Sequence, residues 1–324
     1  MSKKINRFFK LNFKDKLWVF LYYIIVDFFI FKFQCWYNFS GKYTFQNRSK
    51  GKEKLLIIVA GYKSFLWEVT LERITRFIDS DIDVCVCVPK ADNSDLCNIA
   101  KENGWSYLVT RENKLSLAQN FTIRLHSRAK YIYKLDEDII IGKNFFKNIF
   151  STYKKIKDDG LYNVGLVVPL LNINGCTYID FLDYIKKSEE YKKKFGELRS
   201  SVMEIKCHYD GEAAIFLWEN SFPFDALVEK IESDNREQYK VVPHRFSIGA
   251  IFFERSFWKK MRYFKVAPEG FLGVEESEVG IFSMENSYPI ILAKDTFAGH
   301  FSFGGEQTVR MREYFSANKE KFKI

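Results

Sequence analysis

The sequence predicts an α/β fold in which a mixed, mostly parallel β-sheet is flanked by helices. Apolar runs of strand length alternate with helix-like segments in steps of roughly 25 residues over the first half of the chain. One run, residues 55–60 (LLIIVA), is continuously apolar, as expected of a strand buried on both faces of a parallel sheet. Apolar residues make up 47% and charged residues 28% of the 324 residues, which is a globular composition rather than a disordered one.

The elements of the first half follow one another as strand and helix. Strands are expected at 55–60, 82–88, 106–109 and 131–136, and helices at 65–79, 94–103 and 116–128. The second half is less regular, and 172–245 fits no simple pattern. Its expected strands are 164–169, 247–253 and 290–293, and its expected helices are 180–195, 224–234 and 306–322.

Three polar turns follow strands of the first half. Gly61, the turn 92–95 and the turn 136–138 each come directly after an expected strand. Because ligands bind at the carboxyl ends of the strands in open α/β sheets, we expect the three turns to face one crevice.

The N-terminal region is basic and aromatic. Residues 1–54 carry twelve Lys and Arg against three acids, an excess equal to the +9 of the whole chain. Residues 17–31 (LWVFLYYIIVDFFIF) are apolar except for Asp27, and are shorter than the about 20 apolar residues of a membrane-spanning helix. Their Trp, Tyr and Phe favour the bilayer interface, so we expect residues 1–51 to attach to an anionic membrane surface.

Two other interpretations of this region stay open: a true membrane span, and a core helix docked on the folded domain. Residues 40–54 are polar and basic and are expected to form a linker. A nucleic-acid partner is not expected, because the positive charge lies beside a long apolar stretch rather than on a folded face. The six cysteines show no zinc spacing, which favours buried thiols in a reducing compartment.

The sharpest local signal is the acidic turn Asp136-Glu137-Asp138 at the end of a strand. Charges enclosed by apolar residues are costly without partners. A hard divalent ion removes that cost, since Mg²⁺ or Mn²⁺ takes one or two carboxylates and fills its shell with water and phosphate oxygens. A solvated acidic turn is the alternative.

Two further signals lie near the C-terminus. In residues 270–278 (GFLGVEESE) glycines lead into acids at the start of an expected helix, where a carboxylate can serve as a general base. His300 lies among aromatic residues and glycines after an expected strand, and imidazole is a good ligand for Mn²⁺-type ions. Each signal taken alone has an ordinary explanation: acids are common in the first turn of a helix, and His300 could be a buried core histidine.

The order of these signals resembles that of GT-A glycosyltransferases, loosely glycosyltransferase family 2 and related inverting families. The resemblance covers about residues 53–305. Its matches, in order, are Leu55 to Tyr62, Asp92-Asn93-Ser94-Asp95, Ala118-Gln119-Asn120, Asp136 and Asp138 as Asp-x-Asp, Gly249 to Phe253, Gly273-Val274-Glu275-Glu276, and His300. The chain departs from the family in having Glu at the base position, and the turn after the second strand is one residue short.

The resemblance implies a GT-A fold that holds a nucleotide-diphosphate sugar, with a UDP-sugar as the guess, through Mn²⁺ or Mg²⁺. The metal ligands would be Asp136, Asp138 and His300. Glu276 would be the catalytic base, and Glu275 would bind the acceptor. Donor contacts would come from Ala60, Gly61, Tyr62, Asp92, Asn120 and Asp136.

The predicted activity is therefore metal-dependent, inverting transfer of a hexose to a glycan or lipid-linked acceptor at the cytoplasmic face of a membrane. Bacterial surface polysaccharide or lipooligosaccharide synthesis is the expected setting. Residues 1–51 would form the membrane-associating segment and linker, 52–305 the catalytic domain (52–143 for the donor, 144–305 for the acceptor) and 306–324 a basic helix. The alternatives are a haloacid-dehalogenase-like phosphohydrolase with an Asp nucleophile, and a non-catalytic membrane-bound subunit of the same shape.

Overall fold

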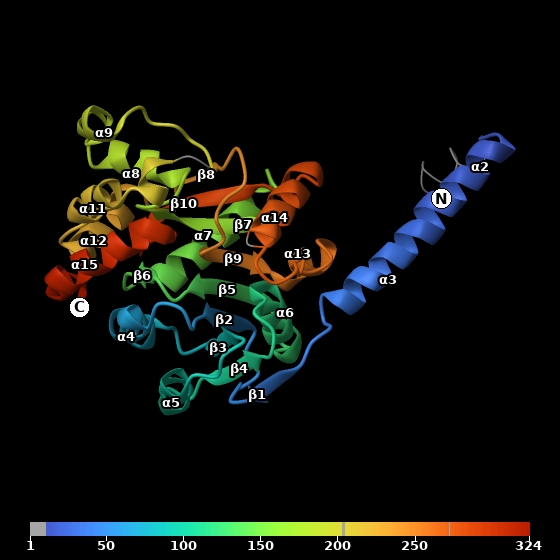
Figure 1. Ribbon diagram of the computed structural model, residues 1–324. Coiled ribbons are helices and arrows are strands. Elements are labelled where there is room, and N and C mark those ends of the chain that lie inside the picture. Colours follow the sequence, from blue (N-terminus) through green and yellow to red (C-terminus); the bar gives the residue numbers. More distant parts are fainter. Residues whose placement is uncertain (1–10, 203–204, 272) are drawn as a thin grey trace.

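The computed structural model describes residues 11–202, 205–271 and 273–324 (Figure 1). Part of the predicted basic segment, namely Lys3, Lys4, Arg7 and Lys10, lies outside the described residues, as does Leu272 of the predicted glycine-containing loop.

Ten strands of the described chain form one sheet in the order β1-β4-β3-β2-β5-β9-β7-β10-β6, with β8 paired to β10. Neighbours among β4, β3, β2 and β5 are parallel, as are β7 and β10, whereas β9 runs antiparallel between the two groups. The strands are β1 (Tyr43–Gln46), β2 (Lys54–Val59), β3 (Ile82–Pro89), β4 (Ser106–Thr110), β5 (Tyr131–Asp136), β6 (Ile139–Ile141), β7 (Leu166–Leu171), β8 (Tyr239–Val241), β9 (Ala250–Glu254) and β10 (Ile290–His300).

Helices cover the sheet on both faces. In the first half α4 and α5 lie on one face and α6 on the other (Figure 1). The helices are α2 (Phe13–Val19), the π-helical η1 (Phe20–Val26), α3 (Asp27–Tyr37), the 3-10 turn η2 (Ser64–Leu66), α4 (Trp67–Phe77), α5 (Ser94–Glu102), α6 (Leu115–Leu125), α7 (Phe145–Asp159), α8 (Thr177–Tyr184), α9 (Ser188–Phe195), α10 (Lys206–Tyr209), α11 (Gly211–Glu219), α12 (Phe224–Asp234), α13 (Arg255–Lys260), α14 (Val274–Glu285) and α15 (Gly305–Phe322). The predicted α/β class, with a mixed, mostly parallel sheet flanked by helices, is confirmed.

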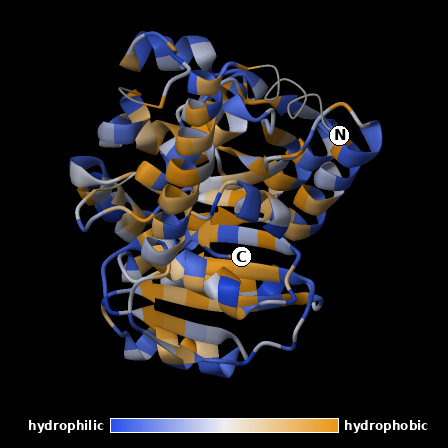
Figure 2. Ribbon diagram, turned by 90° about the vertical axis from the view of Figure 1, so that its right-hand side faces the viewer, coloured by the Kyte–Doolittle hydropathy of each residue, from blue (hydrophilic) through white to orange (hydrophobic). Residues whose placement is uncertain are grey.

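The core lies on both faces of the central strands, which Figure 2 shows coloured mainly as hydrophobic. Residues 55–58 of β2 are fully buried, as the continuous apolar run predicts. Strands β3 and β4 lie on one side of β2, and the chain then crosses back to place β5 on the other side. The carboxyl ends of β2 and β5 therefore flank the point where the strand order reverses, and a doubly wound sheet opens its ligand crevice at such a point.

The N-terminal helix is longer than the apolar pattern suggested. α2, η1 and α3 run together from Phe13 to Tyr37, 25 residues with the length and apolar composition of a membrane-crossing helix. At about 1.5 Å per residue this is about 38 Å. α2 and α3 contain no buried residue, and the helix projects away from the sheet (Figure 1). The interpretation as a docked core helix is therefore wrong for this segment.

The predicted linker over 40–54 is also wrong, because this stretch belongs to the folded domain. Strand β1 pairs antiparallel with β4, from Tyr43 opposite Thr110 to Gln46 opposite Tyr107. The carboxylate of Asp83 accepts hydrogen bonds from Ser49 Oγ (2.6 Å) and from the backbone amides of Lys50 and Lys52 (both 3.0 Å). The polar groups of this stretch form hydrogen bonds with strand β4 and with the buried carboxylate of Asp83.

Candidate active site

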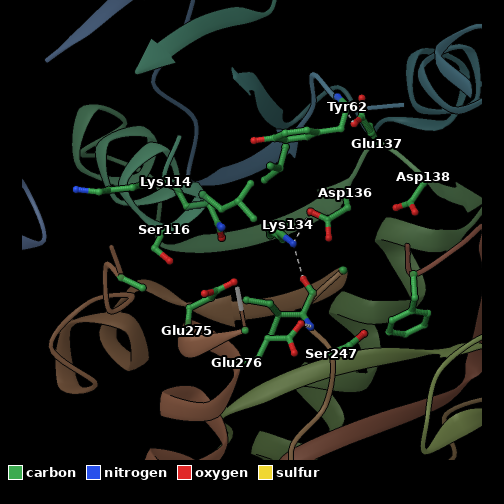
Figure 3. Close-up of a pocket in the computed structure, with 18 of the residues that line it drawn as sticks. Tyr62, Lys114, Ser116, Lys134, Asp136, Glu137, Asp138, Ser247, Glu275 and Glu276 are labelled. Atoms are coloured by element: carbon green, nitrogen blue, oxygen red, sulfur yellow. Dashed lines mark hydrogen bonds and ion pairs between the residues drawn. The ribbon is translucent and has the colours of Figure 1, made fainter. Parts of the chain in front are cut away.

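A cavity of about 570 Å³ opens at the carboxyl ends of β2 and β5. Its walls come from the turn after β2, the acidic turn after β5, the start of α6, the residues before β9, residues 267–271 and 273, the start of α14 and the end of β10. Of the residues predicted for the site, Tyr62, Asp136, Asp138, Glu275, Glu276 and His300 all line this cavity. Figure 3 shows the acidic turn on one side and the Glu275–Glu276 pair on the other.

Glu137 shapes the wall beside β2 rather than binding a ligand. Its carboxylate accepts hydrogen bonds from the backbone amides of Gly61 (3.0 Å), Tyr62 (2.7 Å) and Lys63 (2.8 Å), and from the indole N–H of Trp67. Burial raises the pKa of Glu137, although these donors act in the opposite direction. The middle acid of the turn is thus fully used in holding residues 61–63 against the end of β5.

Asp138 and His300 form the part of the cavity that fits a cation. His300 Nδ1 lies 2.9 Å from the carbonyl oxygen of Ile173, so Nδ1 carries a proton and donates it there. His300 Nε2 then faces Asp138 Oδ2 at 3.5 Å, and Asp138 is only 3% exposed. Burial opposes ionisation of Asp138, but the charges of His300 and Lys63 outweigh it and hold the pKa of this carboxyl well below its ordinary value.

This pair fits a divalent ion of the Mn²⁺ or Mg²⁺ type. Once Nε2 has lost its proton, it would offer a lone pair beside the ionised oxygen of Asp138, and such ions complete their coordination with water and phosphate oxygens. A full set of three protein ligands is not assembled, because within residues 11–202, 205–271 and 273–324 no group of three or more His, Cys, Asp or Glu side chains is placed to hold a metal. Asp136, predicted as the third ligand, turns toward Lys134 instead (Figure 3).

Lys134 links the two sides of the cavity. Its ammonium lies 2.6 Å from Asp136 Oδ1 and donates to the carbonyl oxygen of Ile248 at 2.6 Å, while the side chain is 3% exposed. The amide of Ile248 in turn donates to Glu276 Oε1 at 3.2 Å. A buried ammonium requires such partners, so Lys134 helps to fix the position of Asp136 and, through the backbone of Ile248, that of Glu276.

Glu275 and Glu276 occupy the first turn of α14, which begins after Gly273 at a positive φ of 77°. Burial raises the pKa of both carboxyls, and the neighbouring Glu275 charge raises that of Glu276 further. A carboxylate with a raised pKa accepts a proton more readily once it is ionised, which suits a general base. The structure thus brings into one cavity Glu276, which the sequence predicted as the base, and Glu275, which it predicted to bind the acceptor.

The remaining predicted donor contacts differ from one another. Tyr62 is 55% exposed at the cavity, and its hydroxyl donates to Asn113 Oδ1 at 2.6 Å. Ala60 and Gly61 contribute only to the turn behind the wall, since neither lines the cavity. Asp92 lies away from the cavity, where it accepts a hydrogen bond of 2.9 Å from Tyr107.

Asn120 is a correction, because its amide is used entirely within the protein. Asn120 is fully buried, and its Nδ2 donates to the carbonyl oxygens of Phe264 (2.8 Å) and Asn38 (3.3 Å). Its Oδ1 accepts from Trp258 Nε1 (3.0 Å) and from the amide of Phe264 (3.1 Å). Asn120 holds α6 against the segment after α13, and it does not line the cavity where a nucleotide sugar could bind.

Two lysines of the site were not predicted from the sequence. Lys134 was visible as a charged residue in an otherwise apolar strand (YIYKLD), a pattern that demands a buried partner. Lys63 directly follows Gly61-Tyr62, where its side chain reaches Asp138 and donates to the carbonyl oxygen of Ser302 at 2.8 Å. Nothing in the sequence around Lys63 marks this contact, because its partners lie 75 and 239 residues further along.

Comparison with known proteins gives a similarity in structure but none in sequence. No known protein-family model matches the chain, and no curated protein matches it in sequence. The fold is similar to that of a mannosyltransferase from Pyrobaculum calidifontis solved in complex with GDP-Man and Mn²⁺, with 12% sequence identity and a TM-score of 0.48. The similarity covers 90% of this chain and 71% of that chain. A similarity at this level concerns the arrangement of backbone elements, and it assigns no role to any residue of this chain.

Proposed function

We propose that this protein is a glycosyltransferase of the GT-A type that moves a hexose from a nucleotide-diphosphate sugar to a hydroxyl acceptor. One observation carries the proposal: a single cavity has Asp138 beside His300 on one side and two carboxyls with raised pKa, Glu275 and Glu276, on the other. Sugar transfer needs both, since charge develops on the leaving diphosphate while the acceptor hydroxyl loses a proton.

The leaving-group side is the end of the cavity at Asp138. A bound Mn²⁺ or Mg²⁺ would neutralise charge on the diphosphate there, and Asp138 and His300 would hold it. Lys134 positions the carboxylate of Asp136, which we assign to the donor ribose rather than to the metal. The nucleoside would rest at Tyr62, the exposed ring of this wall. UDP-sugars and GDP-sugars are the first donors to test.

The acceptor side is the start of α14. Glu276 would take the proton from the attacking hydroxyl, and Glu275 would orient the acceptor. A base that faces the donor from the opposite side of the sugar leads to attack opposite the leaving group, and this inverts the anomeric centre. The hydrogen bond from the amide of Ile248 holds Glu276 in place for that role.

The N-terminal helix supports a membrane-bound acceptor. Phe13, Trp18, Tyr23, Phe29 and Phe33 are each at least 61% exposed along it. Such a helix lowers its free energy by entering a lipid phase. We therefore propose a glycan or lipid-linked acceptor at the cytoplasmic face, as in bacterial surface polysaccharide or lipooligosaccharide synthesis.

The first experiment is a thermal-shift panel of sugar nucleotides with and without MnCl₂, followed by transfer assays with the donors that bind. Binding to the native state raises the melting temperature in a concentration-dependent way. A metal-enhanced shift with one nucleotide series, together with sugar transfer, supports the proposal. Phosphate release from simple phosphoesters would instead favour the phosphohydrolase. Donor hydrolysis and transfer at background level with every donor would favour a non-catalytic subunit.

A further inference from the structure

The ammonium of Lys63 occupies the cation position of the donor side. It contacts Asp138 Oδ2, the same oxygen that His300 Nε2 faces at 3.5 Å, and it donates to the carbonyl oxygen of Ser302 at 2.8 Å. The Lys63 side chain is 19% exposed and that of Asp138 is 4% exposed. Asp138, the proposed metal ligand, is therefore already paired with the ammonium of Lys63.

The backbone explains why Lys63 reaches this position. Its amide donates to Glu137 Oε1 at 2.8 Å, so the turn that carries Lys63 is fixed beside the acidic turn. A buried carboxylate without a compensating charge is strongly destabilising, and the Lys63 ammonium supplies that charge. The side chain itself is a flexible four-carbon stem, which can move without any change in the turn.

The ion pairs of Asp136 and Asp138 determine how favourable metal binding would be at this end of the cavity. Asp136 and Asp138 are each paired with an ammonium, Lys134 and Lys63 respectively, so neither aspartate carries an uncompensated charge for a divalent ion to neutralise. The ion would also have to share Asp138 Oδ2 with an ammonium, and like charges at such separations repel strongly in a poorly hydrated site. A bound diphosphate would supply negative charge to the metal and would give the displaced ammonium of Lys63 a new partner.

We propose that Lys63 is a built-in counter-cation that competes with the divalent metal for Asp138 and passes to the donor diphosphate when the metal binds. The inference rests on the proposed nucleotide-sugar site. It makes metal binding and diphosphate binding mutually dependent, because each removes the obstacle to the other, and such coupling is reciprocal by thermodynamic necessity. The metal then binds more tightly when the nucleotide is bound than when the nucleotide is absent.

The test measures binding of MnCl₂ alone, by electron paramagnetic resonance of the free ion, with no donor or acceptor present. Lys63→Met keeps the stem and removes the charge, so Mn²⁺ should bind about 10-fold or more tightly than to the wild type, a change worth about 1.4 kcal/mol. The matched control is Lys114→Met, which removes a lysine from the same cavity wall whose ion-pair partner is Glu112 rather than Asp138.

Equal Mn²⁺ affinity in wild type and Lys63→Met, or an equal gain in Lys114→Met, would overturn the inference. Lys63→Arg keeps the charge and should bind Mn²⁺ as weakly as the wild type, so tight binding by this variant would also overturn it. If Lys63→Met does not fold, wild type alone still decides: its affinity for UDP and GDP should rise about 10-fold or more with MnCl₂, and no rise contradicts the coupling. Sugar transfer is not read out, so a failed proposed function leaves the MnCl₂ comparison valid.

Discussion

Asp138 is the residue on which the donor side depends. Replacing Asp138 by Asn keeps its shape but removes the charge that a metal requires, so metal-dependent transfer should fall at least about 100-fold, as when one electrostatic contact to a developing charge is lost. Initial rates with saturating Mn²⁺ measure the effect, and a thermal melt confirms that the variant is folded. Asp92→Asn is the matched control, since Asp92 lies outside the cavity. A wild-type rate for Asp138→Asn would contradict the metal assignment.

Glu276 is the residue to test on the acceptor side. Glu276→Gln retains an oxygen that accepts from the amide of Ile248 but cannot take a proton, so turnover should fall about 10²- to 10⁴-fold while donor binding is kept. Glu278→Gln is the control on the same helix, because Glu278 pairs with Lys265 and does not line the cavity. Full activity of Glu276→Gln would move the base to Glu275.

The pH dependence of the rate follows from the burial of Glu276. The base must be ionised to act, and burial raises its pKa, so the neutral, inactive form persists to higher pH than for a free glutamate. The acid limb of kcat/KM should therefore lie above the ordinary value of about 4.3, with the rate increasing as pH rises through the raised pKa. A limb at or below 4.3 would show that a carboxyl in an ordinary environment controls the rate.

At this scale the sequence located most of the residues that line the cavity but not what each side chain contacts. The acidic turn was found because three acids stand between apolar residues, yet sequence cannot show that Glu137 points at backbone amides while Asp138 points at His300. Lys63 was missed because its contacts are long-range. Asn120 was misassigned because a motif match says nothing about whether an amide is already satisfied inside the core.

The turn after β2 is an element whose conformation depends on one side chain. Glu137→Gln leaves an amide that cannot accept from all four donors, and an unsatisfied buried donor costs about 1–3 kcal/mol. We expect a lower melting temperature and faster amide exchange at residues 61–63. Glu102→Gln, at an exposed position of α5, should change neither. Unchanged exchange at 61–63 in Glu137→Gln would show that other contacts hold the turn.

Among the elements, the strands and helices between residues 54 and 136 were predicted well, because each is a continuous apolar run or an amphipathic segment, whereas β1, β6 and α7 were missed. The second half was predicted less well. The expected helix 180–195 is two helices, α8 and α9, separated where Lys186 takes a positive φ of 58°. The expected strand 290–293 continues to His300, because buried Asp295 accepts from the amide of Glu237 and thereby tolerates burial within β10.

For the whole molecule, the N-terminal helix should decide where the protein resides. The structure shows that a truncation must spare Asn38, which is buried and accepts from the amide of Val266 at 3.1 Å. A variant lacking residues 1–36 should stay folded and lose flotation with anionic liposomes, since it lacks the exposed aromatic residues and lysines. Equal flotation of the truncated form would contradict membrane attachment. Resistance of the full chain to alkaline extraction would distinguish a spanning helix from an interfacial one.

One ion pair connects this helix to the folded domain. Arg262 lies after α13 and contacts Asp27 at 3.1 Å, and its guanidinium also lies over the ring of Phe31. Arg262 shares its segment with Phe264, which Asn120 ties to α6, so the helix attaches to the domain beside α13 and α6 (Figure 1). The overall α/β class followed from local patterns, but this attachment did not, because it joins residues 235 positions apart.

The way Glu137 holds the turn has a consequence for how such a protein can diversify. The carboxylate accepts hydrogen bonds from the backbone amides of residues 61–63, and every residue type except proline has such an amide N–H. A substitution at position 63 therefore leaves the backbone of the turn in place, although it removes the ammonium that compensates Asp138. If Lys63 competes with the metal as proposed, single substitutions at this position should change the affinity for the ion while the turn keeps its conformation.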